Sequence, residues 1–431
     1  MPGLLDTVYK YAVAAIFIFI PLYPKFPLFN VPYTYVAIRA EDFFIAITFA
    51  ILVLKLLSEK KISLPSITPQ IIIFLVVGLI SSLSAILVTK NVQPLLVLLH
   101  FARRVEYISV FFLVYFAVKN NKDRLFFLEL ILLPAIGVFL YGLAQMFFEA
   151  PVISTMDREA SKGIALTLRP GVTLSSTFAG HYDLAVYLSM IMIFLISITA
   201  SVKKWTLSLL PIAGFSALMW LFMQTGSRIS LAGLIISVLL VTAIYRRYLL
   251  SMLFLGIIGI GVITSPSILS RFQNIINIFV RQSQNILLFP AYAQTPSPTP
   301  SPEPLRAVQE DRSTSIRFDV EWPRAIRSLY KNPLLGTGYS SLTLATDSDY
   351  LRALGETGLL GFLAFISLLI GLFKSLRGRV NTTGTDKIIA VSSLGIFSFF
   401  LITALFLDVF EASKVATLFW AFMGLAVSIK A

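Results

Sequence analysis

A polar segment, residues 315–362, carries the side chains whose types and spacing could do chemistry. Arg317 and Arg324 lie in its first part, and Asp347 and Asp349 come shortly before the next apolar run. A carboxylate can act as a general base that takes the proton from an attacking hydroxyl. An arginine can stabilise the negative charge that develops on a phosphate leaving group, because its planar fork of donors matches phosphate oxygens. The segment therefore favours a reaction in which a group is transferred to a hydroxyl and a phosphate departs as the leaving group.

Further candidate residues lie outside this segment, in stretches that connect other apolar runs. Arg228 stands in the short turn TGSR, residues 225–228, and Arg169 stands in the loop LTLRPG, residues 166–171. Arg228 could bind substrate or contact a lipid headgroup, and Arg169 could bind substrate or be a solvated loop charge. His181 and Asp183 open an apolar run and could be catalytic or could cap a helix.

Hydrophobic composition decides what kind of scaffold must position these residues. The 431-residue chain is 57% hydrophobic and only 13% charged, with a mean hydropathy of +0.84. Soluble domains carry about 25% charged residues, so repeated apolar runs of about 18 residues or more predict an all-α, polytopic membrane protein. We expect about twelve transmembrane helices. They are residues 9–24, 41–57, 70–89, 94–118, 125–148, 182–201, 205–224, 229–245, 249–266, 354–373, 388–407 and 415–430.

Loop charges predict how the helices are oriented. Lys and Arg gather after every second predicted span, which by the positive-inside rule makes those loops and both termini cytoplasmic. The two long loops, about 149–181 and 267–353, then lie outside the cell. The chain divides into nine spans (1–266), a large outer loop (267–353) and three further spans (354–431). The large outer loop contains a Pro-rich tract, residues 294–304, which is typical of an extended spacer.

The remaining composition excludes several function classes. The chain has no cysteine, which excludes disulfides, thiolate catalysis and zinc–thiolate sites. His100 and His181 are its two histidines, so neither a metal site nor a cofactor is expected. The net charge of +13 is explained by cytoplasmic loops, so nucleic acid is not expected as a partner.

Charged residues also occur within one predicted span. Arg103, Arg104 and Glu106 lie inside residues 94–118, where ionisable groups are costly and are therefore candidates for function. They could pair with one another or with Glu41 and Asp42, either as a buried network that fixes helix packing or as part of a substrate site.

Three stretches together resemble the O-antigen ligase and O-antigen polymerase superfamily of membrane glycosyltransferases. They are TGSRISLAG (225–233), IRFDVEWPRAIRSLYKNPLLGTGY (316–339) and DSDYLRALGETGLLGF (347–362). The resemblance implies a GT-C-like fold with a large extracytoplasmic loop before the tenth span, in the cytoplasmic (inner) membrane. It also implies inverting, metal-independent transfer from an undecaprenyl-diphosphate-linked glycan to a glycan, lipid or protein acceptor, among membrane lipids.

The resemblance assigns roles by position. Arg228 and Arg317 would bind the donor diphosphate, with Arg169 beside them. Asp347 stands where ligases commonly have a histidine base, so Asp347 or Asp349 would be the base or would orient the acceptor, and this difference favours a polymerase over a ligase. Further substrate contacts are expected from His181, Arg324, Tyr350, Arg352 and Glu356.

Two other functions remain open. Twelve spans also suit a secondary transporter or flippase for lipid-linked or anionic substrates, although such proteins usually show two similar halves and a site at the membrane midplane. A membrane protein without catalysis could instead present the Pro-rich tract to partners.

Overall fold

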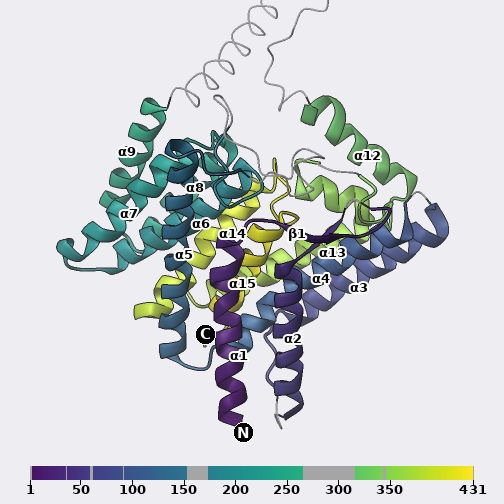
Figure 1. Cartoon of the computed structure of the whole chain (residues 1–431), viewed down its shortest axis with the longest axis horizontal. Coiled ribbons are helices and arrows are strands. Elements are labelled where there is room, and N and C mark those ends of the chain that lie inside the picture. Colours follow the sequence, from purple (N-terminus) through teal and green to yellow (C-terminus); the bar gives the residue numbers. More distant parts are fainter. Residues whose placement is uncertain are drawn as a thin grey trace, which may run out of the picture.

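A computed structural model describes residues 2–34, 36–58, 62–90, 92–152, 173–265, 316–342 and 346–430 of the chain. Within them, every predicted span corresponds to a helix (Figure 1). These are α1 (Pro2–Leu22), α2 (Ala40–Ser58), α3 (Thr68–Ser84), α4 (Pro94–Ala117), α5 (Asn121–Phe147), α6 (His181–Ser201), α7 (Trp205–Met223), α8 (Arg228–Ile244), α9 (Tyr248–Thr264), α13 (Asp349–Arg377), α14 (Gly384–Thr403) and α15 (Ser413–Val427).

The helical membrane class is thereby confirmed, whereas the number of spans stays a prediction. Seven of the described helices are long and apolar enough to cross a membrane, and three more apolar helices are shorter, namely α8, α9 and α15. Most of the predicted loop at 149–181, residue Arg169 and the Pro-rich tract at 294–304 lie outside the described residues.

Two helices form the centre of the bundle. Most residues of α6 are buried, and α15 is buried along its whole length. Phe194 of α6 and Phe422 of α15 meet edge to face, with ring centroids 5.3 Å apart. Helices that are apolar all round are typical of the interior of a large bundle. The outer helices instead expose leucine and isoleucine, for example Leu133, Leu210 and Ile260, on the surface where lipid is expected.

Short elements that the sequence did not predict lie between these helices. The strands β1 (Pro27–Asn30) and β2 (Ala37–Arg39) form an antiparallel hairpin between α1 and α2, in which Asn30 pairs with Ala37. A π-helical turn, η1 (Ala85–Thr89), extends α3. A second, η3 (Ile316–Glu321), leads into α12 (Trp322–Lys331). The described part of the chain is therefore helical with one small hairpin.

Close packing of α8 against α14 fixes one end of the site. Ser237 Oγ donates a hydrogen bond to the carbonyl oxygen of Gly395 at 3.0 Å. A Cβ on Gly233 would come within 2.9 Å of the Phe399 ring, so the two helices approach closely there. Because the helices are antiparallel, Arg228 at the start of α8 lies at the same end as the segment 404–412 that follows α14.

A break in α13 fixes the other part of the site. Gly358 has φ +67° and ψ −168°, which interrupts the helix after its first nine residues. The segment 333–338 satisfies the backbone groups that the break leaves without helical partners. The N–H of Gly338 donates to the Glu356 carbonyl at 2.8 Å, and the N–H of Leu359 donates to the Pro333 carbonyl at 2.8 Å. The segment 333–338 thus holds a broken helix in place.

Candidate active site

An ion pair joins the two residues that the sequence marked for donor binding and base catalysis. Nε of Arg317, on η3, lies 2.8 Å from Oδ2 of Asp347, on the segment that enters α13. Arg317 is buried, whereas the Asp347 side chain is 28% exposed. A carboxylate that is reachable from outside and held beside an arginine is the arrangement that a base next to an anion-binding group requires.

Asp408, in the segment between α14 and α15, holds the backbone on which Asp347 stands. Its carboxylate accepts hydrogen bonds from three successive N–H groups, those of Thr346 (2.9 Å), Asp347 (3.2 Å) and Ser348 (3.2 Å). Asp347 itself has φ +50°, a left-handed conformation that aspartate tolerates better than most residues. Sequence reasoning assigned Asp408 no role, although an aspartate in a short polar segment between two apolar helices was a usable signal.

The surroundings move the pKa values of these two carboxyl groups in opposite directions. Burial raises the pKa of Asp347, the charge of Asp408 raises it further, and Arg317 opposes both. Burial also acts to raise the pKa of Asp408, but Arg352 and the backbone N–H groups outweigh it and hold that pKa below its usual value. Asp408 therefore serves as the permanent anion, and Asp347 is the group more ready to take up a proton.

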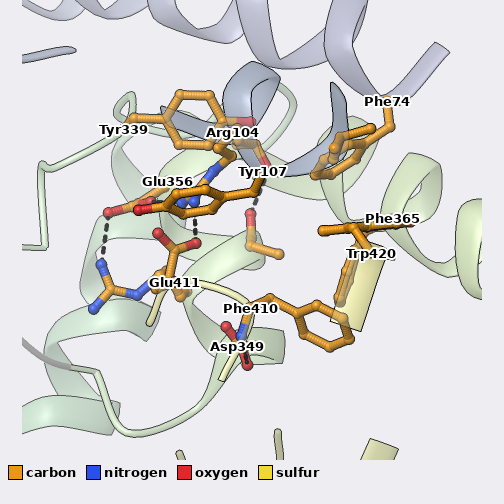
Figure 2. A pocket seen from close by; sticks show the side chains of 14 residues that line it. Phe74, Arg104, Tyr107, Tyr339, Asp349, Glu356, Phe365, Phe410, Glu411 and Trp420 are labelled. Atoms are coloured by element: carbon orange, nitrogen blue, oxygen red, sulfur yellow. Dashed lines mark hydrogen bonds and ion pairs between the residues drawn. The ribbon is translucent and has the colours of Figure 1, made fainter. Parts of the chain in front are cut away.

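A buried ion network continues from Asp408 into the bundle. Arg352 donates to Asp408 at 2.7 Å and to Glu356 at 3.2 Å. Arg104 donates to Glu356 at 3.3 Å, and it also forms an ion pair with Glu411. The Arg104 guanidinium lies 4.3 Å from the centre of the Tyr339 ring, and Figure 2 shows it between this ring and the two carboxylates. Losing one partner of a buried ion pair costs about 3–5 kcal/mol, so these residues fix α4, α13 and the 404–412 segment relative to one another.

The two arginines of α4 pair with different carboxylates. Arg103 pairs with Asp42, one of the expected partners, at 3.9 Å, and it donates to the Ala37 carbonyl at 2.7 Å. Arg104 instead pairs with Glu356 and Glu411, which sequence reasoning missed because both lie more than 250 residues away along the chain.

Asp349 and Tyr350 occupy the first turn of α13. Asp349 is 4% exposed and accepts a hydrogen bond from the N–H of Phe410 at 3.1 Å. The hydroxyl of Tyr350 donates to the Leu401 carbonyl at 3.0 Å, and the side chain of Ser348 caps the helix. Between the two candidate carboxylates, the more exposed Asp347 suits a base, whereas Asp349 ties α13 to the segment before α15.

The structure also places the other predicted residues. Arg228 begins α8, and Arg324 lies on α12, next to η3. His181 is the first residue of α6, but Gly180 occupies the N-cap without a side-chain hydrogen bond, so neither His181 nor Asp183 caps the helix. Asp183 instead pairs with Lys25 at 3.5 Å. Arg169 lies outside the described residues, and its role stays a prediction.

Two cavities lie beside the site, and Tyr107, Arg352 and Glu411 line both of them. The smaller has a volume of about 50 Å³ and is walled by aromatic rings of Phe74, Phe365, Phe410 and Trp420, with Asp349 and Glu356 (Figure 2). The larger has a volume of about 350 Å³ and is lined by charged residues, including Asp408. In the described part of the chain, no group of three or more His, Cys, Asp or Glu side chains is arranged to hold a metal ion.

The fold and the site together define a polytopic helical membrane protein with an arginine–carboxylate pair at one end of its bundle. Residues 213–366 match the family model described as O-antigen ligase. The match runs from α7 into α13 and includes Arg228, Arg317 and Asp347, whereas Arg104, Asp408 and Glu411 lie outside it. No curated protein matches the chain. The resemblance that the three sequence motifs indicated is confirmed.

Proposed function

We propose that the protein is a glycosyltransferase that moves a glycan from an undecaprenyl-diphosphate carrier to an acceptor hydroxyl at the outer face of the cytoplasmic membrane. The observation that carries the proposal is the Arg317–Asp347 ion pair inside the family-matched region. These residues stand 30 positions apart, on two different elements, and they meet at the end of the bundle from which the predicted outer loops emerge. The family match supports a membrane enzyme of the O-antigen ligase type.

In the proposed reaction the acceptor hydroxyl oxygen attacks the anomeric carbon of the first sugar on the carrier. The bond from this carbon to the diphosphate oxygen breaks, and its electron pair leaves with the diphosphate. Asp347 takes the hydroxyl proton, as a general base must. Attack opposite the leaving group inverts the anomeric configuration.

Arginine would stabilise the departing diphosphate. Arg317 contacts Asp347 through Nε, and its terminal nitrogens would meet diphosphate oxygens. Arg228, at the same end of the bundle, would contact the diphosphate from the opposite side, with Arg169 as a further contact. Donors aimed at developing charge contribute factors of about 10² to 10³ each in other enzymes.

An aspartate at the position of the family's histidine favours a polymerase over a ligase, with a glycan as the acceptor. The two activities leave different products in a strain that lacks the protein. Single repeat units on the carrier indicate a polymerase, and long polymer retained on the carrier indicates a ligase. If neither species accumulates, the transporter alternative is favoured.

The decisive test is the analysis of lipid-linked glycan in a deletion strain complemented with variants. We expect Asp347→Asn and Arg317→Lys to lower glycan transfer at least tenfold, because the first removes the base and the second removes the planar fork. Arg327→Ala is the matched control, since Arg327 is exposed on neighbouring α12. Full transfer by folded, membrane-inserted Asp347→Asn protein would refute the proposal.

One observation bears on the transporter alternative. Arg103 lines a cavity that reaches the middle of α4, but other charged walls come from Lys25, Arg39 and Asp408, on segments that join helices at one end of the bundle. A site near one end suits a transferase acting at a membrane face, whereas transporters bind near the midplane.

A further inference from the structure

Apart from Arg352 of α13, the larger cavity is built from residues that the family match does not include. Its walls come from the β1–β2 hairpin region, the middle of α4, the start of α6 and the segment 408–413. His100 and Tyr107 lie about 9 to 20 Å along α4 from its first residue, at about 1.5 Å per residue. The cavity volume of about 350 Å³ falls within the range of small-molecule sites, about 300–1,000 Å³.

Charges in the wall differ in how closely they are paired. Asp408 and Glu411 have tight partners, since Asp408 accepts from Arg352 at 2.7 Å and Glu411 pairs with Arg104. Three cations have only distant carboxylates. The pairs Lys25–Asp183, Arg39–Glu41 and Arg103–Asp42 measure 3.5, 3.6 and 3.9 Å. Charge-assisted hydrogen bonds usually measure about 2.7–2.9 Å, so these three cations are not closely paired with those carboxylates, although Arg103 also donates to the Ala37 carbonyl at 2.7 Å.

Two lining residues also have buried donors without a partner. Among the described residues, Nε of Arg39 and Nε of Arg352 are buried and donate no hydrogen bond to an acceptor of the protein. Arg352 as a whole is 6% exposed. A buried donor without a partner costs about 1–3 kcal/mol, which a bound acceptor would recover.

The position of the cavity relative to Asp347 indicates which substrate it faces. Arg317 contacts the Asp347 carboxylate from η3, where the donor diphosphate is proposed to bind. Asp408 contacts the backbone N–H of the same residue and also lines the cavity. Asp408 therefore links the backbone of the proposed base to the cavity wall, whereas neither Asp347 nor Arg317 lines the cavity.

We propose that this cavity binds a carboxylate-bearing sugar of the acceptor glycan, held by Lys25, Arg39 and Arg103. The three cations already face protein carboxylates at long distances, so a ligand carboxylate would bind them in the same way as these carboxylates but more closely. Asp183, Glu41 and Asp42 keep the empty cavity close to neutral and exclude polyanions. The assignment to an acceptor rests on the proposed function, whereas the binding of an acidic sugar does not.

Binding of free sugars to the purified full chain in lipid nanodiscs tests the proposal. Glucuronic acid and glucose are the probes, because they differ only in the carboxylate, and ligand-observed NMR gives each affinity. We expect glucuronic acid to bind at least tenfold more tightly than glucose. The double variant Lys25→Gln/Arg39→Gln should lose this preference, and Arg327→Gln on exposed α12 should keep it.

Lys25→Gln alone is the second variant, for use if the double variant does not fold. It leaves the contact between Arg39 and Ser413 intact. It should weaken glucuronic acid at least threefold and leave glucose unchanged. Equal affinities for both sugars, tighter binding of inorganic phosphate than of glucuronic acid, or no saturable binding below about 10 mM would overturn the proposal. The measurement contains no donor, so its outcome is independent of whether Asp347→Asn abolishes transfer.

Discussion

At the scale of single residues, the site depends on two aspartates that have different roles. Asp347 carries a partly exposed carboxylate beside Arg317, and Asp408 holds the backbone of Asp347 through three N–H groups. Burial and the charge of Asp408 raise the pKa of Asp347, while Arg352 keeps Asp408 ionised. One carboxylate is thus kept as a fixed anion so that the other can exchange a proton.

The first prediction is a pH dependence. Asp347 acts as a base only when deprotonated, so activity should fall as the pH drops through its raised pKa, above the ordinary value of 3.8. Asp347→His should retain activity and move this acidic limb to higher pH, because an unperturbed imidazole has a pKa of about 6.5. Transfer rates measured across pH for both proteins check this. An unchanged limb in the histidine variant would show that another group is the base.

The second prediction concerns Asp408 as a positioning residue. Asp408→Asn keeps one oxygen for the loop N–H groups but removes the charge that pairs with Arg352, so we expect kcat to fall about tenfold or more. KM for the donor should change little. The measurement is kcat and KM per folded molecule, with folded protein quantified separately. A loss of folded protein with unchanged kcat would mean that Asp408 has only a structural role.

At the scale of elements, a broken helix positions the site. Gly358 interrupts α13, and the segment 333–338 fills the gap with backbone hydrogen bonds. Polar backbone inside a bundle is tolerated where protein groups satisfy it. The first half of α13 then carries Arg352 and Glu356 into the ion network, and the cap residue Ser348 follows directly after Asp347. A continuous helix would point these residues in other directions.

The third prediction tests this break. Gly358→Ala would place a Cβ 2.5 Å from the backbone of Leu334 and Gly336, at φ +67°, so we expect a loss of more than about 3 kcal/mol of stability and loss of transfer. Gly384→Ala is the control, because Gly384 has φ +62° with nothing within 4 Å and should lose only about 1 kcal/mol. Thermal unfolding in detergent compares them, and equal losses would argue against a packed junction.

At the scale of the whole molecule, segments far apart in sequence meet at one end of the bundle. The hairpin after α1, the start of α8, η3 and the segment 404–412 all contribute residues to the site or its cavities. Figure 1 shows α7 to α9 on one flank and α3, α4 and α12 on the other, with α6, α14 and α15 between them. The site therefore depends on the complete bundle rather than on the family-matched region alone.

The fourth prediction is the orientation of that end. The chain has no cysteine, so single cysteines can be introduced without background. Tyr33→Cys, at an almost fully exposed position in the hairpin, should react with a membrane-impermeant maleimide in intact cells. Lys203→Cys, between α6 and α7, should react only after the cells are lysed, because positively charged loops stay in the cytoplasm. Reversed labelling would contradict the proposed outer location of the site.

The sequence by itself determined the helical membrane class, the position of each apolar helix and the resemblance to O-antigen ligases, because all three depend on local composition and contiguous motifs. It also singled out Arg317 and Asp347, since ionisable groups beside apolar runs are conspicuous. The tertiary structure decided which charges meet. Glu356 and Glu411 as partners of Arg104, Asp408 as the support of Asp347 and the larger cavity all join residues more than 50 positions apart. Such contacts arise from how helices pack, and a pattern along the chain does not record which helix faces which.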